Sequence, residues 1–494
     1  MVPRRLGWVI GAVACLTAWA SDGLGAAAGR PPNFLFIYTD DQRFDALGVV
    51  QREQGERGRF PWLQTPNLDR LAASGVRFRN AFVVNSLCSP SRATLLTGQY
   101  GHANGVVSNQ VPHPPGNLSL PALLRPAGYS SAYIGKWHHG KESGKRPGFD
   151  HSVSFVGQGV YFDCPLEIDG VATPSRGFVD DVTTDYAARY IRDHRAGPFL
   201  LILGFKTCHK PFQPPPRHDR TYDGQRARRT PNLGSRPPFK VADREAANRP
   251  IAADDDATVP TNLGMFRGIT AIDDNVGLLL DLLDELGIAD DTVVCFSSDN
   301  GFYLGEHGLG DKRSAYDEAM RVPLLVRYPR LAAAGRVEDR MVLNVDTAPT
   351  FLDLAGVPVP SAMHGRSWRP LLEGRTEVPW RDNFFYCYFF ERGFATPTTT
   401  ALRTSDAKLI IYPGHDGWTE LFDLKADPYE TRNVADDPAY APMRASLEAA
   451  YREQVLAVGF RVPDLVEVPP TDGPMPASVK LSPDPKGRSK SRVR

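Results

Sequence analysis

The sequence predicts an α/β protein in which a mostly parallel sheet is flanked by helices and followed by a small antiparallel C-terminal subdomain. Three observations lead to this fold class. Apolar runs of strand length alternate with amphipathic helical segments from Asn33 to about Val359, as in a parallel sheet with helical crossovers. Several of these runs end directly in charged residues. After residue 376 the pattern changes to strand-like runs joined by turns.

The first unit expected along the chain is an export signal at residues 1–28. Arg4 and Arg5 form a basic start. They are followed by an apolar run and then by three alanines that offer a cleavage site. The apolar run is too short for a comfortable membrane span. A twin-arginine signal and a lipid attachment at Cys15 fit less well, because their other motif residues are missing. We therefore expect an exported protein, periplasmic or secreted, with no membrane span.

The elements of the larger expected domain, residues 32–375, follow from the hydrophobic pattern. The candidate strands are Asn33–Thr39, Ser131–Ile134, Phe199–Phe205, Thr292–Phe296 and Val322–Val326. The clearest helix runs from about Met265 to Leu286 with an apolar stripe at 3-4-3-4 spacing, and Gly287 follows it as a plausible C-cap. Residues 206–262 lack clear periodicity, and a long irregular segment of this kind is usually functional or disordered.

The C-terminal part is expected to hold an antiparallel subdomain at residues 376–465 and a tail at residues 466–494. The stretches "NFFYCYFFERG" and "AKLIIYPGHDGWTELFDL" are typical of antiparallel strands joined by turns. The tail is rich in proline and ends in regularly spaced basic residues. A disordered, solvated tail is the favoured interpretation, and binding to an anionic glycan or surface is the secondary one.

Charge and cysteine content narrow the function classes. The chain has 57 basic and 57 acidic side chains, so no global field points to nucleic acid or a membrane surface as a partner. One of the six cysteines falls within the signal, which leaves an odd number in an oxidising compartment. An odd cysteine indicates either a special thiol or a buried, unreactive one, and the count leaves both open.

Four of the expected strands end in polar residues that could meet at one edge of the sheet. These residues are Asp40-Asp41, Lys136 with His138 and His139, His209 with Lys210, and Asp299-Asn300. In an open α/β sheet, ligands bind beyond the carboxyl ends of the strands. Taken singly, each cluster is explained as well by a turn or a helix cap. Together, three carboxylates and one amide oxygen favour a hard cation, Ca²⁺ or Mg²⁺, over a zinc site of His and Cys.

A set of cationic residues accompanies the predicted metal site. Its members are Arg92, Lys136, His138, His209 and Lys312. Buried cations need anionic partners. A metal surrounded by such side chains is best explained by a tetrahedral oxyanion substrate, sulfate or phosphate.

The stretch "CSPSRATLLTG" places Cys88 at the start of an expected helix. Ser89 is suited to cap this helix, Pro90 fits its first turn, and Gly98 ends it. The amide groups and the dipole at a helix N-terminus favour negative charge. A reactive thiolate would suit this place, and a small buried apolar residue is the alternative.

This stretch resembles the C-x-P-x-R signature of the formylglycine-dependent sulfatases. Further blocks resemble the same family in the same order: "NFLFIYTDDQR", "TPNLDRLAASGVRFRNAF", "GYSSAYIGKWH", "HKPF", "FSSDNGFYLGEHGL", "DKRSAYDEAMRVPLLVRYP" and "ELFDLKADPYETRNVADDP". The resemblance covers roughly residues 32 to 437 and implies the alkaline-phosphatase-like fold. This sequence departs from the family pattern at two positions. Residue 139 is histidine where leucine is common, and Pro126 is expected to end its helix early. Neither position belongs to the signature.

The resemblance also implies the nature of residue 88 and the metal ligands. Cys88 would be oxidised to formylglycine by a formylglycine-generating enzyme, which reads Pro90 and Arg92, and the aldehyde hydrate would be the nucleophile. The implied ligands of a Ca²⁺ ion, with Mg²⁺ as the alternative, are an oxygen of modified residue 88 together with Asp40, Asp41, Asp299 and Asn300.

The family pattern assigns a role to each cationic residue. Arg92 would stabilise the hydrate, and Lys136 and Lys312 would hold the sulfate oxygens. His138 would deprotonate the second hydroxyl of the hydrate, which expels sulfate. His209 would protonate or polarise the leaving oxygen, as a poor leaving group requires.

The function expected from the sequence is an exported sulfatase that hydrolyses sulfate esters, with a sulfated carbohydrate as the substrate. The carbohydrate is inferred from fold-level analogy. A phosphonate monoester or phosphodiester hydrolase of the same superfamily is the first alternative, because it shares the motif and the metal set. A non-catalytic carbohydrate-binding protein is the second.

Overall fold

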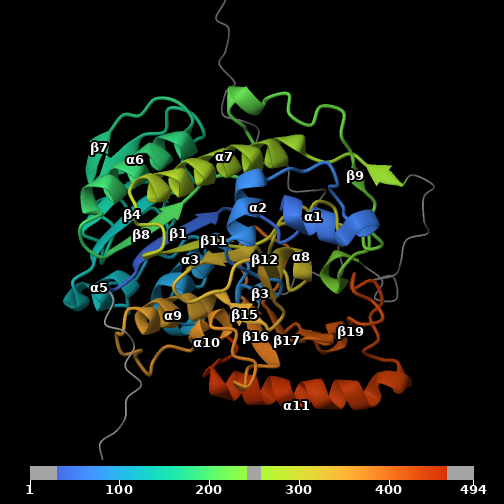
Figure 1. Cartoon of the computed structure of the whole chain (residues 1–494). Helices are drawn as coiled ribbons and strands as arrows, with labels where there is room; N and C mark the ends of the chain where they lie inside the picture. The colour runs from blue at the N-terminus through green and yellow to red at the C-terminus, as the bar shows by residue number, and fades with distance from the viewer. Residues whose placement is uncertain (1–29, 242–256, 464–494) are drawn as a thin grey trace, which may run out of the picture. The chain divides into compact units, whose positions relative to one another are not determined.

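The computed structural model describes residues 30–241 and 257–463, and the predicted signal and tail lie outside them (Figure 1). A ten-stranded sheet forms the centre of this part of the chain. Its strands, in spatial order, are β14 (Arg336–Glu338), β2 (Val76–Phe78), β13 (Leu324–Arg327), β11 (Thr292–Ser298), β1 (Asn33–Thr39), β8 (Phe199–Gly204), β4 (Ser130–Lys136), β5 (His151–Phe155), β6 (Leu166–Ile168) and β7 (Val171–Thr173). The five strands from β11 to β5 are mutually parallel, so the predicted fold class is confirmed.

Four of the five predicted strands are β1, β4, β8 and β11. The fifth, predicted at Val322–Val326, is wrong as one strand. Pro323 has no N–H to donate to a sheet, and the chain here divides into β12 (Arg321–Val322) and β13, which belong to different sheets. β13 also runs antiparallel to β11. A second small sheet has the order β12, β3 (Ala81–Phe82), β15 (Val342–Leu343).

Helices cover both faces of the large sheet, as Figure 1 shows. One face contacts α1 (Gly48–Gln54), α2 (Pro66–Ala73), α6 (Val179–His194) and α7 (Leu263–Glu285). The other contacts α3 (Cys88–Thr97), α5 (Leu120–Leu124), α9 (Thr347–Leu354) and α10 (Arg369–Leu372). Both faces are therefore buried, which explains why the strands are apolar runs without alternation.

The predicted helix near Met265 is α7, and the side chain of Asn262 caps it by accepting from the Gly264 amide. Gly287 follows α7 in the left-handed conformation that glycine adopts without strain. Between residues 206 and 262 the described residues form turns, two short 3-10 helices (Pro216–His218 and Pro238–Lys240) and the two-residue strands β9 (Ala227–Arg228) and β10 (Thr258–Val259). The irregular segment is thus present.

The C-terminal part contains the predicted antiparallel sheet, in the order β16 (Asn383–Tyr388), β17 (Thr399–Thr404), β18 (Ala407–Ile411) and β19 (Glu420–Asp423). Helix α11 (Ala441–Ala457) lies against this sheet. Aromatic side chains of β16 share a core with Phe82, Tyr303 and Tyr316. The domain boundary at residue 376 stays a prediction. The remaining α-helices of the described residues are the short α4 (Gly101–Asn104) and α8 (Asp317–Met320). Among the described residues, no helix is long and apolar enough to cross a bilayer.

Candidate active site

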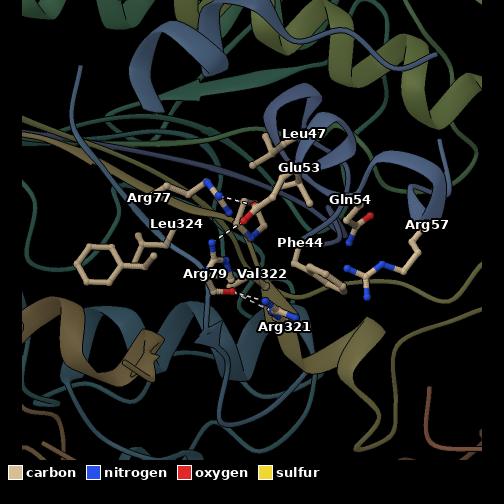
Figure 2. A pocket seen from close by; sticks show the side chains of 13 residues that line it. Phe44, Leu47, Glu53, Gln54, Arg57, Arg77, Arg79, Arg321, Val322 and Leu324 are labelled. Carbon is tan, nitrogen blue, oxygen red and sulfur yellow. Dashed lines mark hydrogen bonds and ion pairs between the residues drawn. The ribbon is translucent and has the colours of Figure 1, made fainter. Parts of the chain in front are cut away.

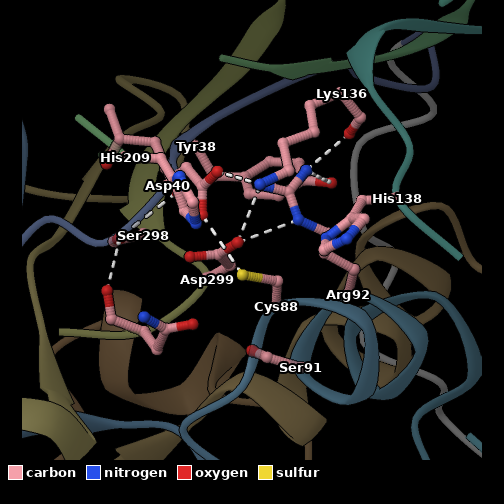
Figure 3. A network of polar contacts seen from close by, with 12 residues as sticks. Tyr38, Asp40, Cys88, Ser91, Arg92, Lys136, His138, His209, Ser298 and Asp299 are labelled. Atoms are coloured by element: carbon pink, nitrogen blue, oxygen red, sulfur yellow. Dashed lines mark hydrogen bonds and ion pairs between the residues drawn. The ribbon is translucent and has the colours of Figure 1, made fainter. Parts of the chain in front are cut away.

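The carboxyl ends of β1, β4, β8 and β11 bring the predicted polar residues together beside the start of α3 (Figure 3). Thr39 of β1 pairs with Ser298 of β11, so the residues that follow them leave the sheet side by side. Backbone hydrogen bonds continue beyond the strands, from the Asp40 amide to Thr207 (2.9 Å) and from the Asp299 amide to Thr39 (3.0 Å). The sheet itself therefore fixes the positions of both carboxylates.

Asp40, Asp41 and Asp299 form a buried cluster in which one carboxylate oxygen of each lies within 4.8 Å of the others. Asn300 donates through Nδ2 to Asp41 Oδ1 (2.7 Å) and to the Gly301 carbonyl (2.8 Å). This orientation leaves Asn300 Oδ1 buried without a hydrogen-bond partner among the described residues, and Asp41 Oδ2 is in the same state. Buried oxygens need partners, and an all-oxygen donor set fits a hard divalent cation.

Burial and the neighbouring charges shift the pKa values of two of these carboxylates in opposite directions. Burial alone would raise the pKa of Asp40, but Lys136, His209, Arg92 and Lys312 together hold that pKa well below its ordinary value. Burial, followed by the neighbouring charge of Asp40, raises the pKa of Asp299.

Cys88 is fully buried at the first residue of α3 and faces the carboxylates. Its Sγ lies 3.4 Å from Asp40 Oδ1 and 3.2 Å from Lys312 Nζ. Burial, with the charge of Asp40, raises the pKa of the thiol to about 12. This environment therefore disfavours a reactive thiolate at Cys88. All five cysteines of the described residues are buried and free of disulfides.

The predicted capping role of Ser89 is wrong. The N-cap position is Leu87, and the Ser89 hydroxyl instead donates to the carbonyl of His138. The Ser89 amide donates to Asn109 Oδ1 at 3.0 Å, so a side chain from another segment satisfies an amide that has no partner within the helix. Ser89 thereby ties the start of α3 to the end of β4. Gly98 ends α3 in the left-handed conformation, as expected.

Arg92 lies on α3 beneath the site and is fully buried. Its Nε and Nη2 lie 2.9 and 2.7 Å from Asp299 Oδ2, and its guanidinium lies over the ring of Tyr38. It also donates to the Tyr38 hydroxyl at 3.1 Å and to the Lys136 carbonyl. Arg92 therefore holds Asp299 and the end of β4 in place, and these contacts pair its charge.

Two buried lysines pair with carboxylates of the cluster. Lys136 forms an ion pair with Asp40, and Lys312 Nζ lies 2.5 Å from Asp41 Oδ1. The side-chain carbonyl of Gln158 accepts a second bond from Lys136 at 2.5 Å. Both ammonium groups thus lie beside the carboxylate cluster, where an anionic group near Cys88 would meet them.

The two histidines have different environments. His138 follows β4 with positive φ (52°) and is buried, and burial with the charge of Lys136 holds its pKa well below the usual value. His209 is partly exposed, and burial of its ring lowers its pKa to about 4. Its Nδ1 lies 2.7 Å from the Lys210 carbonyl. A carbonyl only accepts, so Nδ1 carries the proton and Nε2, 3.9 Å from Asp41 Oδ2, is the side that can receive one.

Sequence reasoning missed three residues that hold this arrangement: Tyr38, Asn109 and Gln158. Tyr38 is hidden within the apolar run of β1, and the other two lie in loops without a motif. The buried Asp180 was also missed, and it accepts from the Lys206 and Thr207 amides at 2.8 and 3.0 Å. Two acids in the first turn of a helix, here Asp180 and Asp181, give no signal that distinguishes this role from the usual acidic residues of a helix start.

Comparison with known proteins agrees with the site. The sulfatase family model matches residues 32–357, and the model of the N-sulphoglucosamine sulphohydrolase C-terminal region matches residues 305–456. An N-acetylglucosamine-6-O-sulfatase of Bacteroides thetaiotaomicron is 33% identical over 486 residues, with 85% of each chain covered. A solved complex of a protein with its substrate D-glucosamine-2-N,6-O-disulfate has a TM-score of 0.76 and 30% identity, covering 87% of this chain and 98% of that one.

A more distant likeness is to a phosphonate monoester hydrolase of Silicibacter pomeroyi, with a TM-score of 0.68 and 25% identity over 86% of this chain and 95% of that one. Fold and site together define a hydrolase of the alkaline-phosphatase-like superfamily. Within it, the chain belongs to the sulfatase family and is a sulfuric ester hydrolase. The predicted resemblance and enzyme class are confirmed.

Proposed function

We propose that this enzyme is exported and hydrolyses sulfate esters of carbohydrates, using a formylglycine made from Cys88 and a bound Ca²⁺ ion. The observation that carries the proposal is the position of Cys88, buried at the start of α3 between Asp40 and Lys312. A thiol with a pKa near 12 is a poor nucleophile at neutral pH. A buried cysteine at this position is explained if Cys88 is not itself the nucleophile but is first modified by a formylglycine-generating enzyme.

The modified residue would supply a hydroxyl of the hydrated aldehyde to attack sulfur, a covalent route of the kind that splits one hard step into two. The chain's own residues bind and orient the ester. Lys136 and Lys312 hold its charged oxygens from two sides, and Arg92 keeps Asp299 and the end of β4 in place. Lysine ammonium groups in a site closed to water stabilise developing negative charge strongly.

The metal ligands we propose are Asp40, Asp41, Asp299 and Asn300, with an oxygen of residue 88. The oxygen atoms without partners at Asp41 and Asn300 support this assignment, because a cation would satisfy both. Ca²⁺ is favoured over Mg²⁺ because it accepts more and less regular oxygen ligands. When bound, the ion neutralises substrate charge and lowers the pKa of the attacking hydroxyl.

The two histidines are proposed to transfer protons, with His138 as the acceptor and His209 as the donor. A buried His138 with a depressed pKa is neutral at pH 7 and is suited to accept the proton whose removal expels sulfate. His209 offers Nε2 toward the cluster and must gain a proton before it can act as an acid. We expect the incoming sulfate charge to raise its pKa, because a nearby anion favours the imidazolium.

Carbohydrate is the proposed leaving group because of what the relatives act on. The Bacteroides relative is an N-acetylglucosamine-6-O-sulfatase, and the matched complex holds D-glucosamine-2-N,6-O-disulfate. The test is a comparison of kcat/KM for a sulfated monosaccharide, an aryl sulfate, a phosphodiester and a phosphonate monoester. We expect both sulfates to be the better substrates. A preference for the phosphonate would favour the alternative activity, and binding without turnover by modified protein would favour a non-catalytic lectin.

Replacement of His209 by alanine is expected to reduce kcat far more for a sugar sulfate than for nitrophenyl sulfate. A sugar alkoxide needs a proton to leave, whereas nitrophenolate hardly does, and one acid group contributes on the order of 10²–10⁴. If His209 only binds the sulfate group, both substrates will lose rate equally, because that group is common to them. The ratio of the two losses, measured at saturating substrate, decides between the roles.

A further inference from the structure

A second polar cavity is lined by four arginines and shares no residue with the site around Cys88 (Figure 2). It has a volume of about 240 Å³ and lies between α1 with its following turn, β2 and residues 321–324. Its charged lining consists of Glu53, Arg57, Arg77, Arg79 and Arg321. Four guanidinium groups therefore face one carboxylate.

Glu53 is shared between two of the arginines. Its carboxylate oxygens lie 2.5 Å from Arg77 Nη2 and 2.5 Å from Arg79 Nη2. Arg79 also pairs with Asp339, an exposed residue that is not part of the cavity lining. The single carboxylate in the cavity is thus fully engaged, and it offers nothing to the other two arginines.

Arg321 has only neutral partners in the cavity. Its Nε and Nη2 both donate to the carbonyl of Arg79, at 3.0 and 2.5 Å, and its guanidinium lies 4.3 Å from the ring centre of Phe44. No carboxylate of the described residues lies within ion-pair distance of it. Burial and the repulsion from Arg403 and Arg79, opposed by Asp317 and Asp45, lower its pKa to about 10. A cation so weakly compensated favours an added anion.

Arg57 stands at the mouth of the cavity, exposed to solvent. Within residues 30–241 and 257–463 it makes neither a hydrogen bond nor an ion pair. Figure 2 shows its guanidinium turned toward Phe44. An exposed arginine without a partner does not destabilise the fold. Because its guanidinium is turned toward the cavity, its N–H groups are available as hydrogen-bond donors there.

We infer that this cavity binds the sulfate group of free sulfate or of a sulfated saccharide, separately from the catalytic site. Guanidinium forks match tetrahedral oxyanions with two parallel hydrogen bonds. The cavity is smaller than the roughly 300–1,000 Å³ of typical drug-sized sites, which limits the ligand to one oxyanion or one sulfated sugar. Phe44, Leu47 and Val322 supply apolar walls for the carbon face of such a sugar.

The inference is tested by calorimetric titration of the mature full-length chain with sodium sulfate, a sulfated monosaccharide and the same sugar without sulfate. Turnover is prevented by the Cys88→Ala background, so the result does not depend on the proposed reaction. Arg57→Gln is the test variant. Arg176→Gln is its matched control, because Arg176 is also exposed and makes no hydrogen bond or ion pair within the described residues.

We expect two sulfate-binding events and a roughly tenfold loss of affinity in one of them for Arg57→Gln, the scale of one charge-assisted hydrogen bond. Arg176→Gln should match the parent. Binding of the sulfated sugar but not of sulfate would identify a saccharide site, and equal binding of both would identify a sulfate site. A titration that Arg57→Gln leaves unchanged overturns the inference.

Selenate, whose selenium scatters X-rays anomalously, locates the bound ion in crystals. We expect one selenate near Lys136 and Lys312 and another between Arg57 and Arg321. Selenate in the first place alone contradicts the inference. Selenate in the cavity combined with an unchanged Arg57→Gln titration would mark an adventitious ion only, which also overturns it.

Discussion

Replacement of Cys88 by alanine is expected to abolish sulfate ester hydrolysis while the protein stays folded and still binds substrate. Cys88 is small and takes no part in a sheet ladder, and within the described part of the chain its side chain makes polar contacts only with Asp40 and Lys312. The two lysines that we propose as sulfate ligands remain. Deletion of an enzymic nucleophile costs roughly 10⁶ in kcat. Steady-state kinetics and calorimetric binding of a sulfated monosaccharide measure both halves of this expectation.

The matched control is Cys295→Ala, since Cys295 is equally buried on β11 but lies in the apolar core away from the site. It should lower stability and leave kcat unchanged. Mass spectrometry of active protein should show the peptide with residue 88 lighter by about 18 Da, the change from thiol to aldehyde. An active preparation in which Cys88 is entirely unmodified would contradict the mechanism.

The sheet and the candidate site were predictable from sequence for one physical reason. A strand buried on both faces is a continuous apolar run, so a charged residue at its end stands out. Asp40 after β1 and Asp299 after β11 are examples, and parallel pairing then places both at one edge. The C-x-P-x-R signature at Cys88 indicated the type of reaction, which a hydrophobic pattern alone does not indicate.

Contacts between distant segments were not predictable. Asn109 satisfies the start of α3 in place of Ser89, and Gln158 orients Lys136, but both are ordinary loop residues until the chain is folded. Strand β17 was not predicted, because its sequence TTALRT contains no continuous apolar run. Helix α11 was missed because Leu447 is its only buried residue, so it has no wide apolar stripe.

Replacement of Asp41 by asparagine is expected to remove the metal and most of the activity. Asp41 is buried beside Asp40 and Asp299, and its Oδ1 accepts from both Asn300 and Lys312. Loss of one carboxylate leaves the cation less neutralised, and the nearby lysines then repel it. At about 4 Å and an effective dielectric constant near 20, each unit charge is worth about 4 kcal/mol, or roughly a thousandfold in metal affinity. Metal content per protein and kcat/KM measure the two effects.

A matched variant separates loss of the metal from loss of any buried carboxylate. Asp346 is equally buried, but it pairs with Arg381 away from the site, so Asp346→Asn should destabilise the fold and keep the metal. A ligand that binds only the folded state raises the melting temperature. Chelation should therefore lower the melting temperature of the wild type and of Asp346→Asn, while Asp41→Asn should hardly respond. Wild-type activity that survives exhaustive chelation and dialysis would refute the assignment, because the buried, unpartnered oxygens of Asp41 and Asn300 would then have no cation to bind and catalysis would not need one.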